Sequence, residues 1–192
     1  KIPTGKSPVA NDAENQTQLS FLDEKIDTEY IVVNDENSLA DLITKIDIPN
    51  GFSFDTETTS TNPMTCELVG ISIAIEPHKG WYIPVGHKEG VQLRKDLVIA
   101  ALKPILENNS VPKRAHNANF DMMVLATAGI EVQNLGFDTM IAAALCGRRS
   151  IGLKQLALEL FQMDMTEIKA LIGVGKKQIT MAEVPIEKAG LY

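Results

Sequence analysis

The sequence predicts one mixed α/β domain, in which an antiparallel meander of strands is followed mainly by helices. Two observations support this class. Between residues 30 and 85, short β-rich runs alternate with turn residues. After residue 93, apolar residues recur at helical spacing, with one short apolar-basic stretch that suits a parallel strand. The sheet is therefore expected to be mixed and flanked by helices, and 192 residues suit one domain with an additional arm.

The elements are expected in a simple order along the chain. Residues 1–28 are polar and turn-rich, which predicts a linker or disordered arm ahead of a domain at 29–192. Expected strands cover residues 30–33, 51–55, 68–75, 80–85 and 111–115. A first helix begins at Asn37 or Ser38, and others are expected near 93–107, 120–128, 138–146, 153–161 and 186–192. In the helix at 153–161, a stripe expected to face the core contains Leu153, Leu156, Ala157, Leu160 and Phe161.

Charge and composition exclude several classes of protein. With 18 Lys+Arg against 25 Asp+Glu, the net charge of −7 argues against a simple basic nucleic-acid binder. It leaves open an acidic site that takes up cations before acting on a charged substrate. No apolar run approaches the roughly 18 residues of a membrane helix, and no signal peptide opens the sequence. Cys66 and Cys146 are too few for a disulfide scaffold, so we expect a cytoplasmic protein without a membrane partner.

The most informative motif is the pair Asp55 and Glu57, which closes an apolar strand. Residues two apart on a strand point to the same face, so these carboxylates should project together. Side by side they repel each other unless a cation lies between them, and Mg²⁺ or Mn²⁺ prefers such oxygen ligands. The alternative is a solvated strand end without chemistry.

Two further segments carry polar residues at notable places. Asn117 and Asp121 lie at a predicted strand-to-helix junction. Asn117 could cap the helix, and the negative charge of Asp121 could interact favourably with the helix dipole in the first turn. Either residue could have only that structural role. Tyr192 closes the last helical pattern.

In this order the three segments resemble the 3′–5′ proofreading exonuclease domain of bacterial DNA polymerase I, in polymerase family A. FDTETT matches the family's Asp-x-Glu motif, and NANFD matches its Asn-x-x-x-Asp motif. Tyr192 matches the Tyr of a Tyr-x-x-x-Asp motif, whose Asp would come four positions later. Other segments that look like the family's, in the family's order, are ELVGISIAIEP, YIPVGH, GFDTMIAAAL, GVGKKQ and EKAGLY.

The resemblance implies a ribonuclease H-like fold and hydrolysis of phosphodiester bonds at single-stranded DNA 3′ ends with two divalent metal ions, Mg²⁺ or Mn²⁺. It implies that Asp55 bridges both ions, that Glu57 holds the first and that Asp121 holds the second through water. Tyr192 would orient the attacking water. It further implies a polymerase domain in the same parent chain and a monomeric protein. With three of the four carboxylates, the 192 residues alone are expected to bind metal weakly and to have impaired activity.

Two positions expected to contact the DNA end differ from the family's pattern. The position four residues beyond Glu57, often Leu in the family, is Thr61, and the aromatic position before the GVGK loop is Ile168. These changes predict weaker binding of single-stranded DNA or a different contact with its terminal nucleotide. Candidate nucleic-acid contacts are Thr58, Thr61, His116, Asn117 and Phe120, with Arg148 and Arg149 at backbone phosphates or in a solvated turn. Two alternatives remain, an RNA 3′ exonuclease like ribonuclease D and a non-catalytic structural module of a polymerase.

Overall fold

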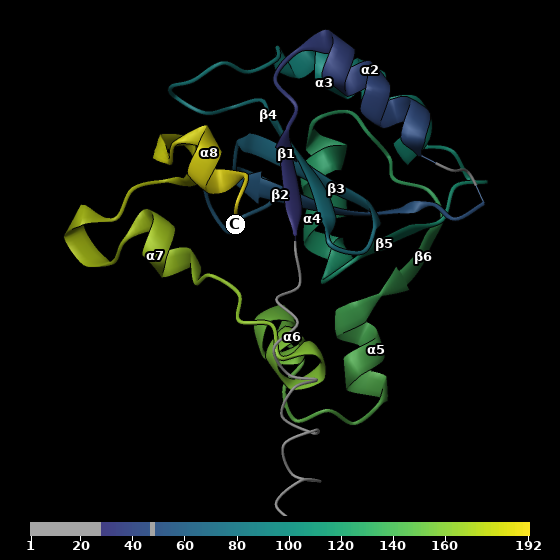
Figure 1. Cartoon of the computed structure of the whole chain (residues 1–192), viewed down its shortest axis with the longest axis vertical. Helices are drawn as coiled ribbons and strands as arrows, with labels where there is room; N and C mark the ends of the chain where they lie inside the picture. The colour runs from purple at the N-terminus through teal and green to yellow at the C-terminus, as the bar shows by residue number, and fades with distance from the viewer. Residues whose placement is uncertain (1–27, 47–48) are drawn as a thin grey trace, which may run out of the picture.

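The computed structural model describes residues 28–46 and 49–192 (Figure 1), so the arm expected at 1–28 lies outside the described residues except for residue 28. Within these ranges the chain forms a six-stranded mixed sheet in the order β1-β4-β3-β2-β5-β6. The antiparallel meander β2–β3–β4 is confirmed, while β1, β5 and β6 pair in parallel with their neighbours. The strands are β1 (Glu29–Val32), β2 (Phe52–Thr58), β3 (Leu68–Glu76), β4 (Lys79–Pro84), β5 (Lys113–Ala115) and β6 (Leu135–Asp138).

Helices flank this sheet, as the sequence predicts. They are α2 (Glu36–Lys45), α3 (Lys95–Leu106), α4 (Ala118–Thr127), α5 (Thr139–Leu145), α6 (Leu153–Phe161), α7 (Ile168–Ile172) and α8 (Ile186–Ala189), with 3₁₀ turns η2 (Gly175–Lys177) and η3 (Met181–Glu183). The first of these helices starts earlier than predicted, because the Asp35 carboxylate accepts bonds from the N–H groups of Asn37 and Ser38 and is the cap. No helix in residues 28–46 and 49–192 is both long enough and apolar enough to cross a membrane.

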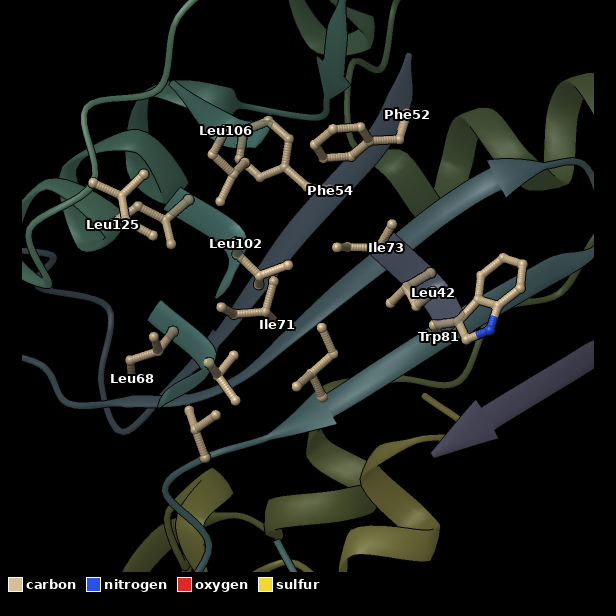
Figure 2. Close-up of a cluster of buried hydrophobic side chains, with 14 of the residues drawn as sticks. Leu42, Phe52, Phe54, Leu68, Ile71, Ile73, Trp81, Leu102, Leu106 and Leu125 are labelled. Carbon is tan, nitrogen blue, oxygen red and sulfur yellow. The ribbon is translucent and has the colours of Figure 1, made fainter. Parts of the chain in front are cut away.

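The main core lies on one face of the sheet (Figure 2). Buried side chains of β2, β3 and β4 pack there against α2, α3 and α4. In β2 the alternation is clear, because Phe52 and Phe54 are buried in this core while Asp55, the next residue, turns away. The strand therefore presents its polar side chains to the opposite face.

A smaller core on that opposite face holds the C-terminal segment against the sheet. Side chains of η3 and α8 pack on Val69 and Tyr82, and Tyr192 joins the edge of this cluster. The His87 ring donates from Nδ1 to the Val184 carbonyl at 2.8 Å, so its Nε2 accepts the Tyr82 hydroxyl at 2.6 Å. The Tyr82 ring needs Gly70 opposite it, because a Cβ there would lie 2.2 Å from the phenol oxygen. These contacts bring the end of the chain to the face that carries Asp55.

The core stripe predicted on α6 is wrong in part. The helix has the predicted bounds, and Leu156 and Ala157 are buried. Leu153, Leu160 and Phe161, however, are 43%, 47% and 66% exposed. The reason is the position of α6, which lies with α5 below the sheet in Figure 1, away from the main core.

Candidate active site

Strand β2 places two carboxylates in an open groove of about 1530 Å³. Asp55 pairs with Ser72 of β3, and Glu57 pairs with Gly70, so both side chains rise from the same face of the sheet two residues apart. The neighbour of Asp55 is the small Ser72, whereas the Tyr82 ring lies over Gly70 beside Glu57. The prediction that the side chains of Asp55 and Glu57 project from the same face of their strand is confirmed.

A third carboxylate, Asp121, comes from the first turn of α4 and is 3% exposed. Its Oδ1 accepts bonds from the Thr56 backbone N–H at 2.9 Å and from the Thr56 hydroxyl at 2.6 Å. Thr56 lies between the other two carboxylates in sequence and points the opposite way, toward α4. It therefore fixes Asp121 relative to the strand that bears Asp55 and Glu57.

The three carboxylates perturb one another in a way that favours a bound cation. Desolvation in the groove, with the charge of Asp121, raises the pKa of Asp55 to about 7, although its side chain keeps a path to solvent. Desolvation and the charges of Asp55 and Asp121 raise the pKa of Glu57 to about 8, against an opposing effect of Lys154. Burial also raises the pKa of Asp121, against the lowering effect of the Thr56 bonds. The charged forms of these carboxylates are therefore disfavoured unless a cation lies close to them.

The fit to a divalent metal rests on this chemistry, since all three groups are hard oxygen donors of the kind Mg²⁺ prefers. Among residues 28–46 and 49–192, no three His, Cys, Asp or Glu side chains are already gathered as a closed ligand set. The charges of Asp55, Glu57 and Asp121 thus influence one another's pKa, but the three carboxylates do not form a closed ligand set. Such a set suits an ion that arrives with its own water and with substrate phosphate.

Tyr192 borders the same groove and is half-buried. Burial and the charges of Glu57 and Asp55 raise the pKa of its phenol to about 12, so the hydroxyl stays protonated at neutral pH. The Nζ of Lys154 lies 4.9 Å from the centre of the Tyr192 ring. The phenol can therefore hold a hydrogen-bonded water near the carboxylates but cannot act as a base.

The residues predicted to contact nucleic acid divide into two groups. Thr58, Thr61, His116 and Phe120 line the groove together with Asp55, Glu57 and Tyr192. The structure does not bring the remaining three, Asn117, Arg148 and Arg149, into that lining, although all three are exposed.

The prediction that the Asn117 side chain caps a helix is wrong. Asn117 occupies the cap position of α4 in a left-handed conformation, with φ 61°, and its side chain makes no cap hydrogen bond. Asp138 caps this helix instead, because its carboxylate accepts the N–H groups of Asn117 at 3.2 Å and Ala118 at 2.8 Å. It also accepts those of Met140 at 2.8 Å and Ile141 at 3.3 Å, so one carboxylate caps both α4 and α5.

Sequence reasoning missed three residues that shape the site. Thr56 could have been noticed as the buried residue between two outward carboxylates, but its bond to Asp121 joins residues 65 apart. Asp138 precedes a helical pattern and so could have been recognised as the cap of α5, though not of α4. Lys154 carries no sequence signal, since a lysine on a helix is normally solvated.

Comparisons with known proteins agree with this geometry. The model of a 3′–5′ exonuclease family matches residues 30–192. DNA polymerase I of Chloroflexus aurantiacus is 51% identical over 163 residues, covering 84% of this chain and 17% of that protein. The chain spans less than a fifth of the length of the curated relatives it matches, as the 17% and 19% shares of the Chloroflexus and Pseudomonas aeruginosa proteins show.

Solved structures share the fold at low identity. Escherichia coli RNase D, described as an exoribonuclease involved in structured RNA processing, has a TM-score of 0.57 and 23% identity, covering 74% of this chain and 36% of that one. Brucella melitensis NrnC with bound Mg²⁺ has a TM-score of 0.52 and 23% identity, covering 73% of this chain and 65% of that one. These similarities confirm the ribonuclease H-like exonuclease fold. The match over residues 30–192 and the DNA polymerase I relatives show that the chain belongs to the 3′–5′ exonuclease family found in DNA polymerase I.

Proposed function

We propose that this chain is the proofreading exonuclease domain of a DNA polymerase I, and that it releases nucleoside 5′-monophosphates from single-stranded DNA 3′ ends. The observation that carries the proposal is that Asp55 and Glu57 line one groove with Tyr192, while Thr56 between them holds the Asp121 carboxylate through its Oδ1. The family match supports the reaction class. A polymerase domain in the same polypeptide, a monomeric state and a cytoplasmic location complete the proposal.

Each site residue has a distinct role in this proposal. Asp55 and Glu57 would be ligands of the first of two divalent ions, Mg²⁺ or Mn²⁺, and Asp55 and Asp121 would be ligands of the second. When bound, such ions stabilise the entering and leaving oxygens of an in-line displacement at phosphorus. Thr56 donates two hydrogen bonds to Oδ1 of Asp121, which hold that carboxylate in place relative to β2. The protonated Tyr192 hydroxyl orients the attacking water.

The single strand would enter along the remaining groove wall. Thr58 is the last residue of β2 and Thr61 lies in the loop after it, while His116 precedes α4 and Phe120 lies in the first turn of that helix. Phe120 offers an aromatic face for stacking of a base. Asn117, Arg148 and Arg149 are proposed as outer contacts to the strand, beyond the groove lining.

The metal-free protein should lose stability as pH rises, and Mg²⁺ should restore it. Asp55 and Glu57 have pKa values of about 7 and about 8 in the folded state, above their unfolded values of 3.8 and 4.5. The folded state therefore holds more protons than the unfolded state across this interval. Their contribution to the free energy of unfolding is full below the unfolded values and is lost as pH rises through the folded ones. Thermal unfolding at several pH values, with and without Mg²⁺, measures this.

A matched control for that experiment is the double variant Asp55→Asn, Glu57→Gln, in which neither side chain can ionise. Its thermal midpoint should respond less to pH and little to Mg²⁺. Stabilisation by Mg²⁺ that is equal in the two proteins, or independent of pH, would contradict the assignment of these residues.

The direct test of the proposed function is digestion of 3′-labelled single-stranded DNA beside the same sequence as RNA. The assay uses the whole polypeptide that carries these residues, with Mg²⁺, with Mn²⁺ and with a chelator. We expect metal-dependent release of 5′-monophosphates from DNA in the 3′-to-5′ direction. Faster trimming of RNA would favour an activity like that of ribonuclease D, and no release with either metal would favour a structural module.

A further inference from the structure

One charged side chain in the groove is not explained by the proposed roles. Lys154 is the second residue of α6, and its side chain is 28% exposed. Its Nζ lies 4.9 Å from the centre of the Tyr192 ring and 3.8 Å from Oε2 of Glu167, and it donates a hydrogen bond to the Thr166 carbonyl. A solvated surface lysine would not be held from three sides.

The place of this ammonium in the groove is distinctive. The described residues that line the groove include one lysine, Lys154, and one arginine, Arg114. Arg114 is engaged elsewhere, because its Nη1 donates to the Asn50 carbonyl at 2.8 Å. The positive charge of Lys154 attracts the Glu57 carboxylate and opposes the rise in the pKa of Glu57. The ammonium therefore acts on the part of the groove that carries the carboxylates.

Tyr192 needs a lateral contact of this kind. Helix α8 ends at Ala189, and beyond it the backbone hydrogen bond from the Tyr192 N–H to the Ala189 carbonyl, at 3.1 Å, holds the last residue. The apolar cluster under α8 packs one side of the ring. An ammonium over a tyrosine face is attracted by the negative potential of the ring. That attraction can select one orientation of the ring.

We propose that Lys154 is a positioning residue of the exonuclease site, which holds the Tyr192 ring through a cation–π contact so that its hydroxyl faces the water-attack side of the carboxylates. The inference rests on the proposed function and deepens it. The exposed pair with Glu167, whose side chain is 69% exposed, does not account for the arrangement by itself, because such pairs contribute little to stability. The contact with Tyr192 is the one that involves a residue with a proposed role in the reaction.

A double-mutant cycle in the whole polypeptide tests the inference. In Lys154→Met, kcat on single-stranded DNA should fall on the order of 10-fold to 100-fold, because a catalytic group is displaced. KM should change by less than about 3-fold, since uniform binding is not altered. Lys154→Arg should recover a large part of kcat, because a guanidinium also lies well over an aromatic face. Lys169→Met, at an exposed lysine of α7 outside the groove lining, should match the wild type.

The cycle is completed in a Tyr192→Leu background. If Lys154 acts through the ring, Lys154→Met should cost nothing further there, so the two losses are not additive. Additive losses, or an unchanged kcat in Lys154→Met, would overturn the inference. If Asp55→Asn also left activity unchanged, the proposed function itself would fall. Loss of activity in Asp55→Asn together with full activity in Lys154→Met rejects only the role of Lys154.

A readout independent of activity keeps the inference testable in every case. The side-chain methylene protons next to the Lys154 ammonium should be shifted upfield in proton NMR by the Tyr192 ring. The shift should disappear in Tyr192→Leu and be absent from the corresponding protons of Lys169. Random-coil shifts for Lys154 in the wild type would overturn the proposed contact.

Discussion

Replacing Asp55 by Asn is expected to reduce metal-dependent release of nucleotides from single-stranded DNA by about 1000-fold or more. Asp55 is the carboxylate proposed to contact both ions, and a bound ion stabilises transition-state charge by several kcal/mol, which at about 1.4 kcal/mol per factor of ten gives this size. The variant should unfold at the same or a higher temperature than the wild type. The charged form of Asp55 is disfavoured by desolvation and by Asp121, so the neutral amide removes an unfavourable interaction.

Lost activity with retained stability would show that Asp55 acts in the reaction and is not needed for folding. A matched control is Asp41→Asn, which removes the same charge from an exposed position on α2. It should leave both activity and the unfolding midpoint unchanged. An Asp55→Asn protein with more than about a tenth of the wild-type rate would contradict the assignment, since several kcal/mol of stabilisation cannot vanish with so small an effect.

The parts of the site that the sequence predicts are those set by local periodicity. Alternation in β2 places Phe52 and Phe54 in the core, so the carboxylates of Asp55 and Glu57 must share the other face. The pairing of β3 with β4 follows from the short turn at Pro77 and His78 between two β-rich runs, whereas the longer segment 59–67 joins β2 to β3.

The parts that could not be predicted depend on partners distant in sequence. Strand β6 is short, contains Gly136 and has exposed positions, so it lacks a β pattern, and it forms by pairing with β5. The helix expected at 186–192 ends at Ala189, because the packing of Ile186 and Ala189 on the sheet covers only one turn. Capping of α4 by Asp138 involves a contact across 20 and 21 residues, which local rules assign to Asn117.

Asp138→Ala should be the most destabilising polar substitution near the site. Its carboxylate accepts N–H groups at the starts of two helices, and a lost cap costs about 1 kcal/mol in each. We therefore expect the free energy of unfolding to fall by about 2–3 kcal/mol, or the thermal midpoint by about 4–10 °C. These bonds outweigh burial and lower the pKa of Asp138, so its contribution is present above pH 3.8 and is lost as pH falls further.

The same substitution should reduce activity at temperatures where the protein is still folded, because α4 carries Asp121. A shift of about 1 Å in a catalytic group can cost on the order of 100-fold in rate. The matched control is Asp35→Ala, which removes the cap of α2 alone and lies outside the groove lining. It should lower the free energy of unfolding by about 1 kcal/mol and leave kcat unchanged. If both variants kept full activity, Asp138 would be only a cap, and the Thr56 bonds alone would position Asp121.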